Sequence, residues 1–322
     1  MNDRARSVCA PTLSRRSLLQ AVGMAFAAAP LAQMLGCSSS VALSDAGADA
    51  LTGTDARAST DTATATDSAV VTDSAVVTDS AVATDAAGGW VTGGTRALGT
   101  VFPDPFAAPS GSTCTLICQT TIGPCHTLSP LRVDVSDSLD GIPMRLALRI
   151  LDEACAPIPN AVVEIWHTNH LGIYSGNINT MCNSAPEDRA AMYFRGYQRT
   201  DANGRVDFNT CFPGWYRGRA VHIHLRVMTG EYNAADNAAA AVITQLVFSD
   251  DLIRQVFSGV PLYAAHGQPD TTNTTDNIVG GIADRSPYIA DVQRLPNGAM
   301  LASKTFIVKG ATSTSALCTA GR

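Results

Sequence analysis

The sequence predicts an all-β protein, in which a β-sandwich domain follows a long, disordered N-terminal tether. Two patterns predict the sandwich. After residue 110, Gly- and Pro-containing turns alternate with short apolar runs, and residues within these runs alternate between apolar and polar. Length is a third observation, because the roughly 210 residues of this region suit one domain. We therefore expect a single sandwich domain at residues 111–322.

Residues 1–37 have the pattern of an export signal. The segment Ser14–Leu19 (SRRSLL) resembles a twin-arginine motif, and an Ala- and Leu-rich stretch follows that is too short to be read as a spanning helix. The segment Met34–Cys37 resembles a lipoprotein processing site, although Met34 is not the usual residue there. We expect an exported protein, periplasmic or at the cell surface, that is attached to the membrane through a lipid on Cys37. Ordinary cleavage to a freely soluble product stays open.

Residues 38–110 form a low-complexity segment rich in Thr, Asp, Ser and Ala. A Thr-Asp-Ser-Ala-Val-Val unit recurs, and aromatic residues are nearly absent before Trp90. Such a segment buries too little apolar area to offset the entropy of ordering. We expect a flexible acidic tether. Because part of the net charge of −6 lies here, the total charge says little about the substrate.

The first strand pattern of the sandwich lies near residues 145–150. Leu146, Leu148 and Ile150 alternate with polar or small residues, and successive side chains of a strand point to opposite faces. A turn-rich connection at residues 152–160 leads to a second expected strand at residues 161–166.

A tight turn at residues 200–204 separates strand patterns at residues 195–199 and 205–209, which predicts a hairpin. Asp201, Asn203 and Gly204 are residues that tolerate left-handed backbone in such a turn. The same Asp-x-Asn-Gly sequence occurs in calcium-binding loops, but the Glu that such a loop requires downstream is missing.

The strand pattern at residues 221–227 places two histidines on one face. Aliphatic residues alternate there with polar ones, among them His222 and His224, so both imidazoles project together and can reach one metal ion. Tyr216 lies six residues before His222, after a Pro-Gly turn. A phenol beside two imidazoles indicates a mixed oxygen and nitrogen metal site, although an isolated His-x-His pair is also common in hydrogen-bonded structure.

The segment Phe212–His224 (FPGWYRGRAVHIH) resembles the signature of the intradiol ring-cleavage dioxygenases. These non-haem Fe(III) enzymes open catechol rings between the two hydroxyls, and two tyrosines and two histidines hold their ferric ion. A second segment, Val163–Gly176, resembles the block that carries the family's other tyrosine. The resemblance therefore implies four metal ligands: Tyr174, Tyr216, His222 and His224.

The resemblance also implies catalytic roles. Tyr216 takes a proton from the substrate while Tyr174 stays bound, and Arg219 and Gln245 stabilise charge that develops on the substrate. Fe(III) suits such a site because a hard cation favours anionic oxygen donors and imidazole also binds iron. The expected function is intradiol cleavage of a catechol-type diol by O2 to a muconate-type diacid. The expected partners are a small aromatic diol and O2, with no nucleic acid, and the particular catechol and the oligomeric state stay open.

The resemblance covers most of residues 120–285. Residues 122–126 stand where the family usually carries Glu-Gly-Pro, and Ile122 and Cys125 depart from that pattern. Three further blocks resemble the family: residues 195–204 its central hairpin, residues 244–248 the strand whose glutamine faces the active site, and residues 271–278 a weaker C-terminal block. His167 and His170 are expected to line the pocket or lie on the surface, and Trp166 and Trp215 to be core aromatics.

Seven cysteines remain once Cys9 and Cys37 are set aside as parts of the signal and the lipid site. In an exported protein these are expected to form disulfides rather than metal sites. Because seven is odd, at least one thiol is free or bonded to another chain. The pairing cannot be read from the sequence.

Two other classes of protein fit parts of the sequence. The segment Cys155–Ile165 and the later Asp-x-Asn-Gly turn also resemble transthyretin-like sandwiches, which serve as non-catalytic surface binding modules. An extradiol or cupin-type site would require a carboxylate ligand, and none follows His224 at such a spacing. The presence of all four candidate ligands favours the intradiol enzyme over both.

Overall fold

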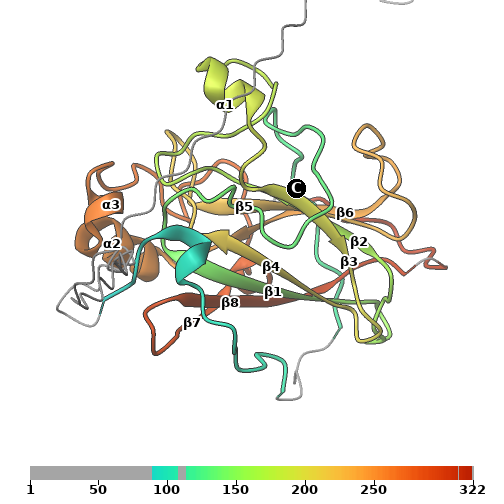
Figure 1. The fold of residues 1–322 in the computed structure, drawn as a ribbon. Helices are drawn as coiled ribbons and strands as arrows, with labels where there is room; N and C mark the ends of the chain where they lie inside the picture. The colour runs from blue at the N-terminus through green and yellow to red at the C-terminus, as the bar shows by residue number, and fades with distance from the viewer. Residues whose placement is uncertain (1–88, 108–113, 311, 321–322) are drawn as a thin grey trace, which may run out of the picture. The chain divides into compact units, whose positions relative to one another are not determined.

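The computed structural model describes residues 89–107, 114–310 and 312–320, and its strands form two four-stranded sheets that lie one over the other (Figure 1). The first sheet has the order β4–β1–β8–β7 and consists of β1 (Pro143–Leu151), β4 (Arg205–Cys211), β7 (Asp291–Arg294) and β8 (Met300–Ile307). The second has the order β3–β2–β5–β6 and consists of β2 (Val162–Trp166), β3 (Arg195–Arg199), β5 (His222–Met228) and β6 (Ala240–Val247). The expectation of an all-β sandwich is confirmed.

The core lies between the two sheets and follows the alternation seen in the sequence. Leu146, Leu148 and Ile150 of β1 are fully buried and belong to the same apolar cluster as alternate residues of β5. These are Ile223, Leu225 and Val227. The opposite face of β5, which carries His222 and His224, is also buried. Loops therefore cover the histidine face of β5 and exclude solvent from it.

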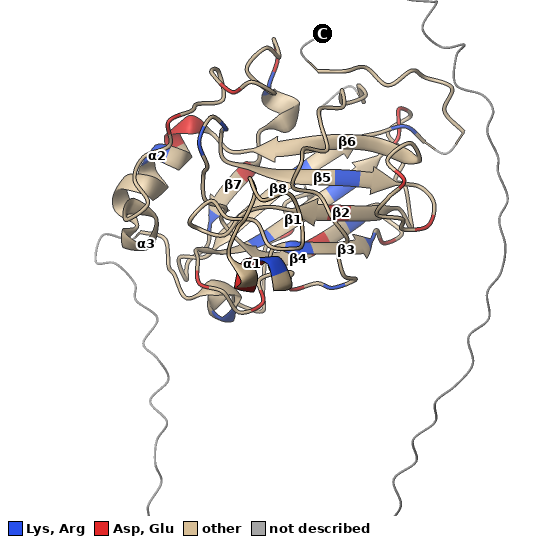
Figure 2. Cartoon of the chain, turned by 90° about the horizontal axis from the view of Figure 1, so that it is seen from above, with Lys and Arg blue, Asp and Glu red and all other residues tan. Residues whose placement is uncertain are grey.

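Short helices complete the described fold. They are α1 (Pro186–Ala190), α2 (Asp250–Gly259), α3 (Pro261–Ala264), η1 (Gly94–Ala97) and η2 (Ser286–Tyr288). At the start of α2, the Ser249 hydroxyl accepts a hydrogen bond from the Leu252 amide, and two acidic residues occupy the first turn (Figure 2). α2 buries Ile253, Val256 and Phe257 against the sandwich core. No helix among the described residues is long and apolar enough to cross a membrane.

The turn at residues 200–204 is present, but the hairpin prediction is wrong. The Asp201 amide donates to the Arg205 carbonyl at 2.8 Å, and of the three residues expected to tolerate left-handed backbone only Gly204 adopts it, with φ 71°. β3 pairs with β2, whereas β4 pairs with β1 in the other sheet. The turn therefore carries the chain from one sheet to the other. β4 pairs with β1 rather than with β3 because its buried side chains Val206 and Phe208 complete the core beside β1.

The N-terminal boundary of the sandwich lies earlier than predicted. Val91 is 1% exposed, packs with apolar residues of β1, β8 and the turn between β7 and β8, and donates its amide to the Gly298 carbonyl at 3.0 Å. Phe102 and Phe106 lie beneath the guanidinium groups of Arg145 and Arg149. Residues 89–107 are thus part of the folded domain, and the expected start at residue 111 is too late. The export signal at residues 1–37 and the tether at residues 38–88 lie outside the described residues and stay predictions.

The cysteine prediction is confirmed for the described residues. Three disulfides join Cys114 to Cys155, Cys118 to Cys318, and Cys125 to Cys182. The seventh cysteine, Cys211, is buried and free.

Candidate metal centre

Four polar side chains converge on the outer face of β5. The Nε2 atom of His222 lies 3.3 Å from Tyr174 Oη, 3.3 Å from Tyr216 Oη and 3.1 Å from His224 Nε2. The structure therefore brings together all four residues that the sequence predicted as ligands. No three His, Cys, Asp or Glu side chains gather as a metal cluster among the described residues, so a metal centre here depends on the phenol oxygens.

β5 supplies both imidazoles from one face because His222 and His224 are two positions apart in a strand. The Nδ1 atom of His222 lies 2.6 Å from the Ala220 carbonyl. A carbonyl only accepts, so Nδ1 carries the proton and Nε2 presents a lone pair toward the other three residues. This orients His222 as a metal ligand would be oriented.

The ring of His224 is oriented by stacking. Trp166 is its partner across the β2–β5 pair, and the two rings lie parallel, with centroids 4.8 Å apart and an interplanar angle of 7°. The His224 Nδ1 atom is buried and has no hydrogen-bond partner among the described residues. Trp166, predicted as a core aromatic, is fully buried as expected. Its contact with a candidate ligand was not foreseen, because only the strand pairing reveals it.

A buried charge network lies behind Trp166. The edge of the His126 ring faces Trp166 with centroids 4.6 Å apart, and His126 Nε2 is 3.2 Å from the Glu164 carboxylate. Glu164 also accepts from Arg226 Nε at 2.8 Å and from the Tyr232 hydroxyl at 2.9 Å. This network satisfies a fully buried carboxylate and supports the Trp166 face of the centre.

Tyr174 lies in the loop that follows β2 and is 1% exposed. The Asn183 side chain donates to the Tyr174 carbonyl at 2.8 Å, and the guanidinium of Arg195 lies 5.9 Å from the centre of the Tyr174 ring. The loop backbone is thereby fixed next to the phenol that it carries.

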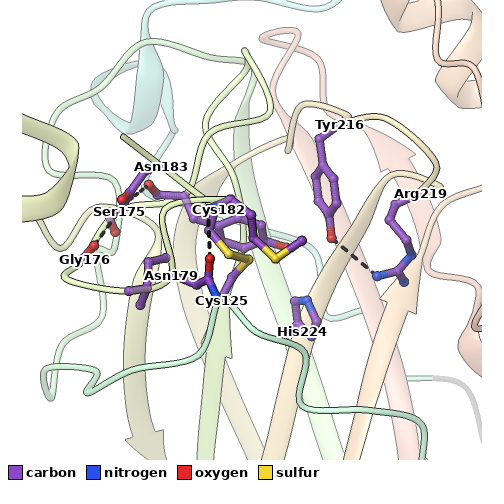
Figure 3. Close-up of a disulfide and its surroundings, with 12 residues drawn as sticks. Cys125, Ser175, Gly176, Asn179, Cys182, Asn183, Tyr216, Arg219 and His224 are labelled. Atoms are coloured by element: carbon purple, nitrogen blue, oxygen red, sulfur yellow. Dashed lines mark hydrogen bonds between the residues drawn. A yellow bond between two sulfur atoms is a disulfide. The ribbon is translucent and has the colours of Figure 1, made fainter. Parts of the chain in front are cut away.

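Tyr216 and Arg219 lie in the turn before β5, and Figure 3 shows Arg219 reaching toward the Tyr216 hydroxyl, at 3.4 Å. Arg219 Nη2 donates to Gln245 Oε1 at 2.6 Å, and its Nε donates to Asp276 Oδ2 at 2.9 Å. Gln245 pairs with His224 across β5 and β6. The structure therefore groups Arg219 and Gln245 with the four candidate ligands, and adds Asp276, which the sequence analysis missed.

Burial sets the protonation of the four residues. It raises the pKa of Tyr174 well above its usual value and also raises the pKa of Tyr216, for which the charge of Arg219 acts in the opposite direction. Burial, helped by the charge of Arg219, lowers the pKa of His222 to about 3, and burial lowers the pKa of His224 as well. At neutral pH both imidazoles are therefore neutral, and both phenols keep their protons until a cation displaces them. Two imidazole nitrogens and two phenol oxygens form a donor set that fits Fe(III).

Known proteins resemble this chain in sequence and in fold. A family model described as dioxygenase matches residues 125–266. The protocatechuate 3,4-dioxygenase beta chain of Burkholderia cepacia is 33% identical over 125 residues, which is 35% of this chain and 48% of that protein. A solved structure, the intradiol ring-cleavage dioxygenase of Tetranychus urticae, is 27% identical with a TM-score of 0.51, and the match covers 64% of this chain and 99% of that one. The sandwich domain belongs to the intradiol ring-cleavage dioxygenase family.

The curated relatives match this intradiol dioxygenase domain over part of their length. The chain spans 48% of the Burkholderia protein, and 22% of catechol 1,2-dioxygenase 2 of Acinetobacter lwoffii, to which it is 37% identical over 68 residues. Members of this family use non-haem Fe(III). The matched residues 125–266 include all four candidate ligands, Arg219 and Gln245, whereas Asp276 lies beyond them.

Two other histidines of the dioxygenase domain do not join the centre. His167 is fully buried, with Nε2 2.7 Å from the Thr210 hydroxyl and Nδ1 2.8 Å from the Thr168 carbonyl. It does not lie on the surface, and its hydrogen bonds explain why it is interior. His170 is half-buried and faces the Tyr263 ring.

Proposed function

We propose that the domain catalyses the intradiol cleavage of a catechol-type aromatic diol by O2 and yields a muconate-type diacid. Tyr174, Tyr216, His222 and His224 would hold a non-haem Fe(III) ion. The observation that carries this proposal is the convergence of two phenol oxygens and two imidazole nitrogens at contacts of 3.1 to 3.3 Å. The bound ion would supply Lewis acidity that activates the diol toward O2.

The two phenols differ in a way that supports a separate role for each. Tyr174 is 1% exposed and its backbone is held on both sides, so it suits a permanent ligand. Tyr216 is less buried and lies 3.4 Å from Arg219 Nη1, whose charge favours the phenolate. Tyr216 Oη is therefore the atom that would accept a proton from the incoming diol.

Arg219 is held so that its charge faces the substrate side. The Asp276 carboxylate accepts from Arg219 Nε and also from the Ala220 amide at 2.8 Å, which fixes the turn and the side chain together. Gln245 holds the Nη2 end. A guanidinium fixed in this way can stabilise negative charge as it develops on the substrate, without reorganising during the reaction.

A transthyretin-like binding module is the alternative function. Such a module has no need for two tyrosines and two histidines to meet on the outer face of a strand, nor for a partly buried Arg219–Asp276 pair beside them. An extradiol site would require a carboxylate among the ligands. The carboxylate beside the cluster, Asp276, is instead paired with Arg219. Both observations favour the intradiol reaction.

Iron content and the visible spectrum of the purified protein test the proposal. We expect stoichiometric iron and a tyrosinate-to-Fe(III) charge-transfer band. Tyr216→Phe should shift the band and slow turnover while iron stays bound, and His224→Ala should lose the iron. Tyr197→Phe is a matched control, because that ring stacks on Tyr232 outside the cluster and should leave both measurements unchanged. A colourless protein fully loaded with zinc would contradict the proposal.

A further inference from the structure

The disulfide between Cys125 and Cys182 lies next to the candidate metal centre. Both cysteines are nearly buried, at 6% and 8% exposed, and form one apolar cluster with Trp166 and Tyr174. Figure 3 shows this disulfide between the loop of Ser175 and Asn183 on one side and His224 on the other. It therefore links two segments that each contact a proposed ligand.

The first of these segments is the loop that carries Tyr174. The Tyr174 amide donates to the Cys182 carbonyl at 3.4 Å. The side chain of Asn183, the residue after Cys182, donates to the carbonyls of Tyr174 and Gly176 at 2.8 and 2.9 Å. Movement of Cys182 would thus be transmitted directly to the backbone of Tyr174.

The second segment is the Gly-Pro loop, Ile122–His126, which lies over His224. A Cβ atom on Gly123 would lie 3.1 Å from His224 Cε1, so the loop backbone closes against the imidazole. Gly123 has φ +70°, which an L side chain rarely adopts. Cys125, two residues later, anchors this loop to the Tyr174 loop.

Arg195 forms a second connection between the same two segments. It is fully buried, and its Nη2 donates to the Cys125 carbonyl at 2.7 Å and to the Ser175 carbonyl at 2.6 Å. The hydrogen bonds of Arg195 and the Cys125–Cys182 disulfide therefore both hold the two loops together. A guanidinium alone can exchange partners, whereas the disulfide sets a fixed limit on the distance between the loops.

We propose that the Cys125–Cys182 disulfide is a positioning element of the metal centre. It fixes the position of the Tyr174 loop relative to the loop that covers His224, so that both donors are in place before the metal ion binds. The inference rests on the proposed function only in taking Tyr174 and His224 as ligands. Residues that orient metal ligands typically change metal affinity by about 10- to 100-fold when removed.

The chain offers a matched control for removing this disulfide. The Cys114–Cys155 disulfide closes a segment of 41 residues, compared with 57 for Cys125–Cys182, and carries none of the proposed site residues. Because the entropy of loop closure changes only with the logarithm of loop length, removing either disulfide should lower the melting temperature by a similar amount. A difference between the two double variants at the metal centre then reports positioning rather than general stability.

The experiment compares Cys125→Ser/Cys182→Ser with Cys114→Ser/Cys155→Ser. In the iron-loaded proteins we expect the first pair to shift the charge-transfer band and to lose iron to EDTA about tenfold faster, with the control unchanged. In the metal-free proteins we expect the amides of residues 174–183 to lose hydrogen-exchange protection in the first pair alone. Cys125→Ala/Cys182→Ala, which suits the apolar surroundings, serves as a second variant should the serines prevent folding.

Equal iron release and equal exchange protection in the two pairs would overturn the proposal. So would failure of both Cys125/Cys182 variants to fold while the control pair folds, because the disulfide would then be needed by the whole domain. Failure of the proposed function can be told apart from failure of this proposal. If the wild-type protein binds no iron, the proposed function fails, but hydrogen exchange of the metal-free protein still measures how the disulfide positions the Tyr174 loop.

Discussion

Arg219 is the residue whose surroundings most clearly suit a reaction rather than a fold. Its guanidinium is partly buried, and it contacts Asp276, Gln245 and the Tyr216 hydroxyl at the same time. An arginine that only stabilised the turn would need one acidic partner. Under the proposed function, the additional contact with Tyr216 would bring this charge close to negative charge that develops on the substrate.

Replacing Arg219 should separate catalysis from metal binding. Arg219→Leu should keep the iron and its colour but lower kcat about a hundredfold, with a much smaller change in KM, because the lost interaction develops mainly in the transition state. Steady-state kinetics and the visible spectrum measure both effects. Arg217→Leu is the control, since Arg217 is exposed in the same turn. Loss of iron from Arg219→Leu would show that the residue holds the metal site together instead.

Single residues also show how far the sequence could predict the centre. The spacing of His222, His224 and Tyr216 is local, so the strand pattern and the turn before it indicated a metal site, whereas Tyr174 came from the resemblance to the family. Asp276 lies 57 residues beyond Arg219 in the chain, and no local spacing connects them. The weak resemblance of residues 271–278 to the family was the one signal that could have pointed to Asp276.

Among the elements, the turn between β3 and β4 sets how the two sheets meet. Its Gly204 has φ +71°, and an added Cβ would lie 2.3 Å from the Ile150 carbonyl oxygen of β1. The tight turn at residues 200–204 predicted a strand on each side of it, because a turn signal is local. It could not predict that each pairs in a different sheet, since pairing depends on residues distant in sequence. The disulfide pairing could not be predicted for the same reason. The odd number of cysteines showed only that at least one thiol is left out of the pairs within the chain.

Gly204→Ala tests the fit of this turn against β1. The substitution combines a positive φ with a backbone clash, so we expect it to lower the free energy of unfolding by about 3 kcal/mol. Gly267→Ala is the matched control: φ is +80°, but nothing lies within 4 Å of its Cβ position, so the expected cost is about 1 kcal/mol. Urea unfolding of both variants measures the difference, and equal costs would refute the predicted contact.

At the scale of the whole molecule, contacts with the sandwich begin by residue 91, inside the segment whose composition predicted a tether. Deleting residues 38–88 should leave activity on a soluble catechol and the melting temperature unchanged. Extending the deletion through residue 107 should lower the melting temperature by several degrees, because Val91 leaves its apolar cluster. A large effect of the shorter deletion would show that the repeats also support the fold.

The buried histidines should make the metal-free protein sensitive to mild acid. Burial, together with the charge of Arg195, lowers the pKa of His167 to about 4, whereas an unfolded chain titrates near 6.5. As pH falls from 6.5 toward 4, the unfolded state binds a proton that the folded state does not, so His167 alone should cost up to about 3 kcal/mol of stability. Urea unfolding between pH 7 and 4.5 should show this loss, and His167→Gln should reduce it. If the free energy of unfolding fell as steeply with pH in His167→Gln as in the wild type, His167 would not be the source of the loss.

The position at which the aromatic ring opens tests the central claim most directly. Iron-loaded protein is incubated with catechol and a panel of substituted catechols under labelled O2, and the products are identified by mass spectrometry. Two tyrosines and two histidines on one ion predict cleavage between the hydroxylated carbons, which gives a cis,cis-muconate-type diacid that carries both atoms of O2. Recovery of a yellow 2-hydroxymuconic semialdehyde would place the cleavage outside the diol and contradict the account.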